Sequence, residues 1–167
     1  CLAAGVTWVD ALLFTHAHAD HVVGLDDVRR FNHLARAALP VYGSAATLAV
    51  LGRMFDYAFR DDPDYPSAKP HLEARAVTGP FELFGRQVTP LPYAHGPTEV
   101  FGYRIGDVAY CPDCNGIPDE LRPRLAHLDV LVLDALRRRP HPIRRASAMA
   151  CSRLKWVGCG RRRSASS

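Results

Sequence analysis

Four side chains that can bind metal ions stand close together near the start of the chain, in the string His16-Ala17-His18-Ala19-Asp20-His21. Imidazole nitrogens and carboxylate oxygens together suit Zn²⁺, Mn²⁺ or Fe, and this spacing can divide the ligands between two neighbouring ions. The alternative interpretation is a polar loop that happens to be rich in histidine. The short apolar run Val9–Phe14 leads directly into the string, which favours a metal site placed at the end of a buried strand.

Further candidate ligands follow later predicted strands. His95 lies in Ala94-His95-Gly96-Pro97 at the end of a strand, where a loop can turn a ligand inward. Asp113 comes after the predicted strand Val108–Cys111, and the alternative there is a plain turn-forming aspartate. Asp134 ends a continuous apolar run and is either a carboxylate that orients a metal ligand or a turn residue. The remaining histidines of the predicted α/β region, which we interpret as surface or packing residues, are His33, His71 and His127.

The elements that must position these residues alternate between helices and strands, which indicates an α/β protein with mixed sheets. The predicted helices are Val22–Ala38, a helix from Ser44 as its N-cap to about Phe59, and Pro118–Leu128, which Pro123 weakens or kinks. The predicted strands are Val9–Phe14, Pro40–Tyr42, Leu72–Val77, two strands within Phe81–Tyr93 that bend at Gly85, two strands joined by a Gly106-Asp107 turn, and Val130–Leu133.

Charged residues are unevenly divided along the chain. Residues 1–136 hold 11 Lys/Arg and all 17 Asp/Glu, a net charge of −6, whereas residues 137–167 hold 10 Lys/Arg and no acidic residue. An Arg-rich segment can bind a phosphate backbone, so a nucleic-acid-binding protein without catalysis is one alternative function. Trp156 is the only aromatic residue of that segment, and it contains no recognisable nucleic-acid module. We therefore do not expect nucleic acid as a partner.

The cysteines and the apolar runs bear on the compartment. Five cysteines at irregular spacing argue against a disulfide framework and favour a reducing cytoplasmic location. The C-x-x-C string Cys111-Pro112-Asp113-Cys114 has no second pair with zinc-site spacing, so we interpret its cysteines as incidental. No run of about 18 apolar residues occurs, and we expect no membrane partner.

The metal-binding string resembles the signature of the metallo-β-lactamase superfamily. The longer string THAHADHVVGLDDVRRFN, residues 15–32, resembles its phosphoribosyl cyclic phosphodiesterase branch, which acts in phosphonate breakdown. The resemblance runs from about Leu2 to Pro142 and includes PVYG at 40–43, YAHG at 93–96 and LDVLVLDAL at 128–136. It implies a partial metallo-β-lactamase αββα sandwich over residues 1–142, with mixed sheets and outer helices.

The resemblance also implies a ligand set for two divalent ions, Zn or Mn. In that set His16, His18 and His95 bind the first ion, Asp20 and His21 bind the second, and Asp113 bridges both.

The reaction implied by the resemblance is metal-dependent hydrolysis of a phosphodiester, on a small or cyclic sugar phosphate. Two ions would lower the pKa of a bridging water to near neutrality and bind the phosphoryl oxygens. The residues implied to act in catalysis are Asp20 and His141. A proton donor for the leaving group is expected in a His-Pro-Thr-His string, of which His141 is the first histidine, and the second histidine, the candidate acid, is missing. Alternatives within the superfamily are a nuclease, a lactonase or a thioester hydrolase. The expected partner is a small-molecule phosphodiester substrate, and homodimer formation is left open.

Three parts of the family pattern are missing from the sequence. These are an N-terminal β-layer with an Asp-Thr-Gly turn, the second His of a His-Pro-Thr-His string, where Arg144 stands, and the last strand and helix with a late ligand histidine. We therefore expect a fragment of a longer reading frame, with exposed strand edges, poor stability and weak or no activity.

Residues 143–167 follow neither a helical nor a strand pattern. We interpret them as a basic, disordered segment outside the family, produced by a reading-frame shift near Pro142. A genuine basic tail with a binding role is the alternative.

Overall fold

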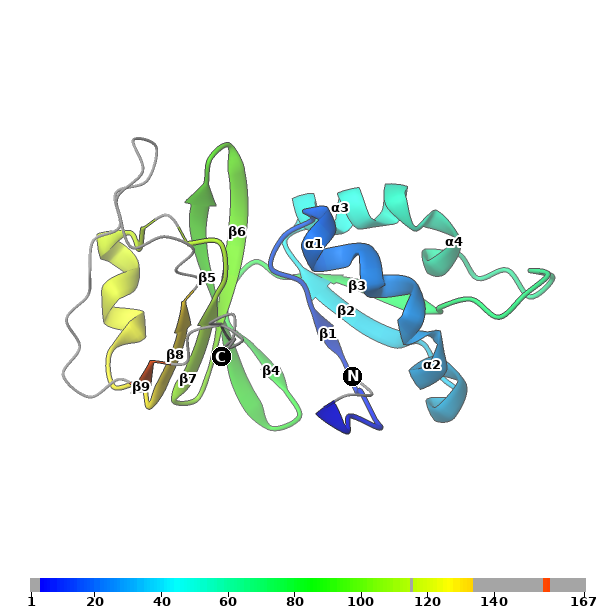
Figure 1. The fold of residues 1–167 in the computed structure, drawn as a ribbon, viewed down its shortest axis with the longest axis horizontal. Helices are drawn as coiled ribbons and strands as arrows, with labels where there is room; N and C mark the ends of the chain where they lie inside the picture. The colour runs from blue at the N-terminus through cyan, green and yellow to red at the C-terminus, as the bar shows by residue number, and fades with distance from the viewer. Residues whose placement is uncertain (1–3, 115, 134–154, 157–167) are drawn as a thin grey trace, which may run out of the picture. The chain divides into compact units, whose positions relative to one another are not determined.

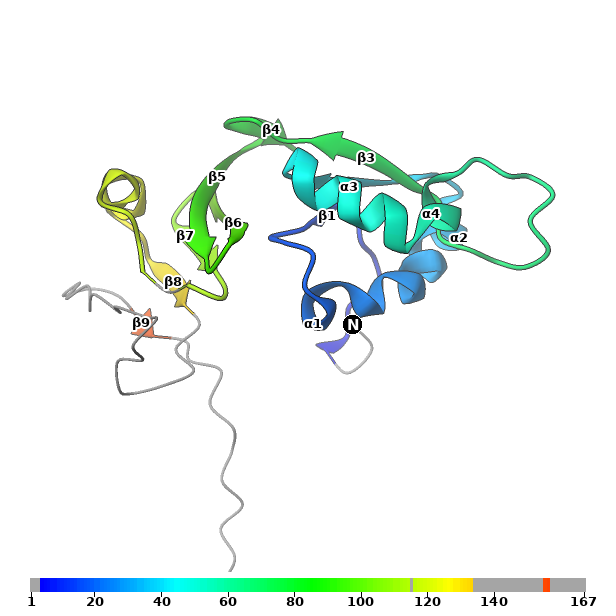
Figure 2. The same ribbon diagram turned by 90° about the horizontal axis from the view of Figure 1, so that it is seen from above.

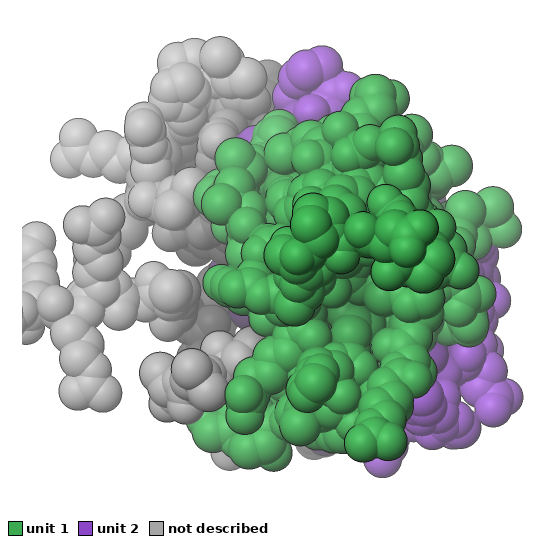
Figure 3. All heavy atoms as spheres, turned by 90° about the vertical axis from the view of Figure 1, so that its right-hand side faces the viewer, with its two compact units in different colours: residues 1–78 green, residues 79–167 purple. Residues whose placement is uncertain are grey.

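The computed structural model describes residues 4–114, 116–133 and 155–156 of the 167-residue chain. The chain divides into two compact units, Cys1–Thr78 and Gly79–Ser167, which Figure 3 distinguishes by colour. Each unit has its own sheet and its own hydrophobic core. The predicted domain boundary after residue 142 lies outside the described residues and stays a prediction. No helix in the described part of the chain is long and apolar enough to cross a membrane.

The first unit is built on a parallel sheet with the strand order β1–β2–β3 (Figure 1). Neighbouring parallel strands end at the same edge of a sheet, so the loops that follow β1 and β2 leave from one edge. The strands are β1 (Leu12–Leu13), β2 (Leu39–Gly43) and β3 (Leu72–Ala76), and the helices are α1 (Ala19–Val22), the 3-10 helix η2 (Val23–Val28), α2 (Arg29–Ala35), α3 (Ala45–Met54) and α4 (Asp56–Phe59).

Side chains from the helices and strands of the first unit form one core. Val41 of β2 and Leu51 of α3 are fully buried there, and Val22 of α1 is nearly so. Burying apolar surface is the main favourable term in folding, so this core holds the helices against the sheet. Its other buried members are Leu25, Leu39, Leu48, Ala58 and Leu72.

Ser44 caps α3, as the sequence predicts. The backbone N–H of Thr47 donates to Ser44 Oγ at 3.1 Å, which satisfies one of the unpaired donors of the first turn. The sequence also predicts that this helix continues unbroken to about Phe59, and this prediction is wrong. Phe55 leaves the helical region with φ −128° and ψ 43°, so α3 ends at Met54 and α4 begins at Asp56.

The helix predicted over Val22–Ala38 is also interrupted. It consists of α1, which begins three residues earlier at Ala19, followed by η2 and α2. Apolar residues three apart, such as Leu25 and Val28, suit a 3-10 helix as well as an α-helix, so their spacing cannot distinguish the two. The segment ends at Arg36, whose φ of 50° lies in the left-handed region.

The second unit is built on a mixed sheet with the order β4–β5–β6–β7–β8–β9. Its strands are antiparallel as far as β7, and β7, β8 and β9 are parallel. The predicted bend at Gly85 and the predicted Gly106-Asp107 turn are confirmed as the connections β4–β5 and β6–β7. The strands are β4 (Phe81–Leu83), β5 (Arg86–His95), β6 (Thr98–Ile105), β7 (Val108–Cys111), β8 (Val130–Leu133) and β9 (Lys155–Trp156).

The 3-10 helix η3 (Asp119–Leu125) packs on one face of this sheet (Figure 2). An α-helix is predicted over Pro118–Leu128, but Pro123 lies inside the segment and has no backbone N–H to donate. The tighter helix buries Leu121 and Leu125 against Leu91, Val100 and Leu131 of the sheet.

Candidate metal centre

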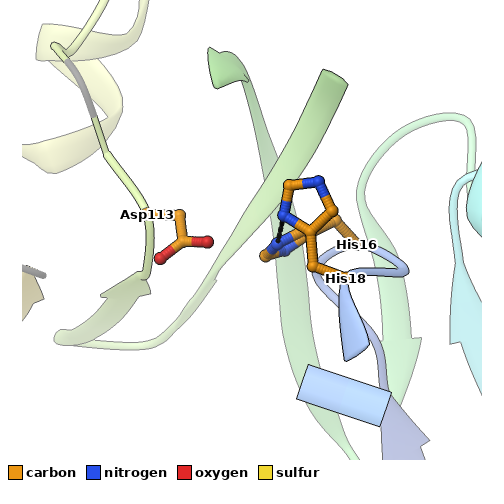
Figure 4. Close-up of side chains that lie close together, drawn as sticks. All are labelled: His16, His18 and Asp113. Atoms are coloured by element: carbon orange, nitrogen blue, oxygen red, sulfur yellow. Dashed lines mark hydrogen bonds between the residues drawn. The ribbon is translucent and has the colours of Figure 1, made fainter. Parts of the chain in front are cut away.

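The loop after β1 brings three imidazole rings of the first unit together. His16 is fully buried, and its Nε2 lies 3.0 Å from Nδ1 of His18 (Figure 4). The ring centroid of His16 is also 4.3 Å from that of His21. His16 thus contacts both of the other rings, and the ring nitrogens of His16 and His18 point toward one another.

Asp20 and His21 form a second pair of neighbouring candidate ligands. Both lie in α1, which begins at Ala19, whereas His18 precedes the helix. Asp20 stands in the first turn of α1, where its side chain is 79% exposed. One carboxylate oxygen of Asp20 lies 3.6 Å from Nε2 of His21, whose side chain is 20% exposed. Asp20 and His18 are therefore the exposed candidate ligands of the string, whereas His16 is buried.

Thr15 contacts His16 on the side away from His18. Its hydroxyl oxygen lies 3.1 Å from Nδ1 of His16, and both residues are buried. Because His16 Nε2 is the atom that faces His18, the two nitrogens of the His16 ring have separate partners.

In the second unit, His95 and Asp113 lie near one another. His95 is the last residue of β5, and the chain turns directly after it at Gly96, whose φ is 59°. Asp113 follows β7 by two residues. A carboxylate oxygen of Asp113 lies 4.0 Å from Nε2 of His95, and both side chains are largely buried. The structure thus brings together the two candidate ligands that the sequence places in this unit.

A hydrogen bond that the sequence does not reveal supports this pair. The hydroxyl of Tyr93, two residues before His95, donates to the backbone carbonyl of Pro112, the residue before Asp113. Asp113 itself has φ 51°, a left-handed conformation that aspartate tolerates better than most residues. The loop that carries Asp113 is therefore attached to the strand that carries His95.

Gly102 on β6 makes room for this contact. A Cβ atom at that position would lie 2.8 Å from the Cys111 sulfur, closer than such atoms approach in proteins, and 3.2 Å from Cε1 of Tyr93, which is tighter than most such contacts. A glycine inside a strand often marks a close approach, and this signal was available in the sequence. Nothing in the local pattern around Tyr93 indicates its partner, because Pro112 is distant along the chain.

Burial keeps the thiol and the phenol beside this loop uncharged. It raises the pKa of Cys111 to about 12, with a smaller contribution from nearby Cys114. Burial also raises the pKa of Tyr93, and Cys111 contributes further. Tyr93 therefore keeps the proton that it donates to Pro112, and Cys111 packs in the core as a neutral side chain.

The donor atoms present fit a divalent metal ion. Each unit offers imidazole nitrogens together with a carboxylate, which are the ligands that Zn²⁺ accepts and that Mn²⁺ also uses. Figure 4 draws three of the candidates, His16 and His18 from the loop after β1 and Asp113 from the loop after β7. Asp134 and His141 lie outside the described residues. His33, His71 and His127 are exposed, as predicted for surface residues.

A family model described as "Beta-lactamase superfamily domain" matches residues 2–156. The chain belongs to the beta-lactamase superfamily. Its α/β architecture, with a parallel sheet, a mixed sheet and surrounding helices, matches part of the metallo-β-lactamase fold, as the sequence predicts.

Solved structures of superfamily members resemble the chain over most of its length. The crystal structure of a diphosphatase from the PhnP family matches with a TM-score of 0.74 and 40% identity, and covers 87% of this chain and 55% of that one. The metallo-β-lactamase fold protein YhfI from Bacillus subtilis matches with a TM-score of 0.57 and 20% identity, covering 78% and 52%. Zn²⁺-bound PqqB from Methylobacterium extorquens matches with a TM-score of 0.50 and 26% identity, covering 75% and 41%.

The name of a curated relative differs from the names of these solved structures. The octanoyltransferase of Porphyromonas gingivalis is 34% identical over 160 residues, which are 94% of this chain but 32% of the relative. The chain thus spans about a third of the length of this relative. Most of that octanoyltransferase lies outside the region that matches this chain.

Proposed function

We propose that this superfamily member is a metal-dependent hydrolase that cleaves P–O bonds of a small phosphate ester, with a phosphodiester as its substrate. The observation that carries the proposal is the contact at 3.0 Å between Nε2 of the buried His16 and Nδ1 of the exposed His18, in the loop at the end of β1. Identity of 40% with a PhnP-family diphosphatase supports phosphoryl chemistry over the other reactions of the superfamily.

The proposed ligands are the six residues that the sequence string and the two strand ends offer. His16 and His18 are ligands of one ion, and His95 completes its imidazole set. The Asp20–His21 pair belongs to a second ion, and the exposure of Asp20 supports a site that opens toward substrate. Asp113 bridges the two ions in this proposal. The separation of 4.0 Å between Asp113 and His95 within the second unit supports their acting together.

Each residue has a defined task in such a centre. A divalent ion held there would lower the pKa of a bound water and neutralise charge on the phosphoryl oxygens. His16 is buried, and each of its two ring nitrogens has a contact. It would therefore set the position of the ion. Asp20, at the exposed rim, is proposed to orient the attacking water. His141 is proposed to take part in the reaction as the remaining histidine of the string that supplies the proton donor, in which Arg144 stands in place of the second histidine.

Hydrolysis of a diphosphate is a second candidate, which the PhnP-family diphosphatase favours. A phosphate leaving group is a weaker base than an alkoxide, so it needs less help from a proton donor. This matters because Arg144 stands where the resembling branch has its second histidine. A chain with a weakened proton donor should retain more activity toward a diphosphate than toward an alkyl phosphodiester.

A substrate screen of the full chain, loaded with Zn²⁺ or Mn²⁺, tests these proposals. The panel contains bis-p-nitrophenyl phosphate, a ribose cyclic phosphate, a nucleoside diphosphate, a lactone and an octanoyl thioester. A His16→Ala/His18→Ala variant sets the background rate, which is needed because the sequence predicts weak turnover. Hydrolysis of a phosphorus substrate above that background is the expected result, read as p-nitrophenol from the aryl diester, a phosphomonoester from the cyclic phosphate, or inorganic phosphate from the nucleoside diphosphate. Turnover confined to the lactone or the thioester would instead assign the chain to carboxylic ester chemistry.

A further inference from the structure

The hydroxyl group of Thr15 lies 3.1 Å from Nδ1 of His16 in a buried part of the first unit. Thr15 is 7% exposed and His16 is 0% exposed, so water has little access to replace this contact. Thr15 has a β-branched side chain, whose χ1 angle is restricted, and this holds the hydroxyl in place. The backbone just before it is attached to β2, because the N–H of Phe14 donates to the carbonyl of Tyr42 at 2.8 Å.

The partners of the two ring nitrogens decide which nitrogen of His16 can bind a metal ion. A neutral imidazole carries one proton, and only the nitrogen without it can be a ligand. If Nδ1 carries the proton, it donates to the Thr15 hydroxyl, and the lone pair of Nε2 faces His18. If Thr15 instead donated to Nδ1, the proton would sit on Nε2, and the nitrogen that faces His18 could not bind an ion.

We propose that Thr15 is a positioning residue of the metal centre, whose hydroxyl accepts from Nδ1–H of His16 and so stabilises the form of the ring that presents Nε2 to the ion. This inference rests on the proposed function, since it assigns Thr15 a task only if His16 is a ligand. Thr15 is not proposed as a ligand of the ion. It would act through the His16 ring, which it holds in orientation and from whose Nδ1–H it would accept a hydrogen bond. Ligand histidines generally hold their second nitrogen in such a hydrogen bond.

Two substitutions at Thr15 separate the hydroxyl from the shape of the side chain. Thr15→Val keeps the volume and the β-branch but removes the hydroxyl, and Thr15→Ser keeps the hydroxyl. We expect Thr15→Val to bind Zn²⁺ about 10- to 100-fold more weakly than wild type in a chelator competition titration of the full chain, the usual loss for such a partner. Thr15→Ser should bind within about threefold of wild type, well under that loss.

Thr47→Val is the matched control. Thr47 is also buried, and its hydroxyl accepts a hydrogen bond from Ser44 at 3.0 Å, but it does not contact a candidate ligand. The control should lose stability without losing zinc affinity. Equal zinc affinities of Thr15→Val, Thr15→Ser and wild type would overturn the inference and leave the proposed function intact. Failure of the wild-type chain to bind zinc would overturn the metal centre and this inference with it.

The protonated nitrogen of His16 can be measured directly in the wild-type chain. Nitrogen-15 NMR of histidine-labelled protein, assigned with a His16→Ala variant, distinguishes a protonated Nδ1 from a protonated Nε2. We expect protonated Nδ1 and zinc-bound Nε2 in the zinc-loaded protein. Zinc on Nδ1 would contradict the inference, and this measurement remains decisive even if Thr15→Val does not fold.

Discussion

The hydroxyl group of Tyr93 donates a hydrogen bond to the backbone carbonyl of Pro112, and this bond attaches the loop of Asp113 to the strand of His95. The two candidate ligands of the second unit are thus held in place by a contact that uses neither of their side chains. The bond lies in the core, where Gly102 leaves the space for it. The geometry of this half of the proposed centre therefore depends on packing as much as on the ligands.

Tyr93→Phe should destabilise the protein by roughly 1–3 kcal/mol, because it leaves the buried Pro112 carbonyl without its donor. Urea unfolding of the variant and of wild type measures the loss. Tyr57→Phe is the matched control, since it removes a hydroxyl that donates to Asp26 at 2.8 Å in a less buried place. A larger loss for the control than for Tyr93→Phe would contradict the importance of the Tyr93 bond.

Ser44→Ala should lower stability by about 1 kcal/mol, because it removes the side chain that accepts from the Thr47 N–H at the start of α3. Ser67→Ala, in an exposed loop, serves as the control and should change stability by less than about 0.5 kcal/mol. Thermal or urea unfolding compares the two. Indistinguishable stabilities would mean that the cap contributes little in solution.

Tyr57 should remain protonated well above the ordinary range. Partial burial raises its pKa to about 12, and the hydrogen bond to Asp26 adds to the effect. A folded-state pKa above the unfolded value of 10.0 means that the contribution to stability is complete below pH 10 and is lost as pH rises toward 12. Ultraviolet titration of wild type against Tyr57→Phe and Asp26→Asn tests this. Ionisation of Tyr57 near pH 10 in the wild-type protein would contradict it.

Asp20→Asn should reduce the metal content at the second site more than at the first. Asp20 is proposed as one of few ligands there, whereas His16 and His18 of the first site are unchanged. Elemental analysis after dialysis should give a metal-to-protein ratio that falls without reaching that of the His16→Ala/His18→Ala variant. A loss as complete as in the double variant would place Asp20 at the first ion instead.

Features set by local chemistry could be predicted from the sequence. The Ser44 cap and the Gly106-Asp107 turn depend on a few neighbouring residues, and both are found. Features that depend on contacts between residues far apart in the sequence could not be predicted from it. The predicted strand Val9–Phe14 is reduced to Leu12–Leu13, because the pairing with β2 determines where it ends. The division into two units after Thr78 likewise follows from contacts between elements, which no local pattern reports.

The candidate site likewise has parts that the sequence predicts and parts that depend on contacts formed in the fold. The string from His16 to His21 could be recognised because spacing alone determines which side chains share a loop. His95 and Asp113 are recognised as candidate ligands from their places at strand ends and from the family resemblance, but their approach to 4.0 Å follows from the register of the sheet. Thr15 stands beside the string, but its contact with Nδ1 depends on the rotamer of the His16 ring. Such orientation is decided by packing and is invisible in a sequence.

The most direct test of a metal centre on the beta-lactamase fold compares the metal content of the full chain with that of a variant that lacks His16 and His18. Wild type and the His16→Ala/His18→Ala variant are purified, incubated with Zn²⁺ or Mn²⁺, dialysed and analysed for metal by mass spectrometry. His33→Ala/His71→Ala, which removes two exposed histidines, is the control. We predict bound metal in wild type and the control and a large loss in the His16/His18 variant. Equal metal content in all three proteins would contradict the proposed centre.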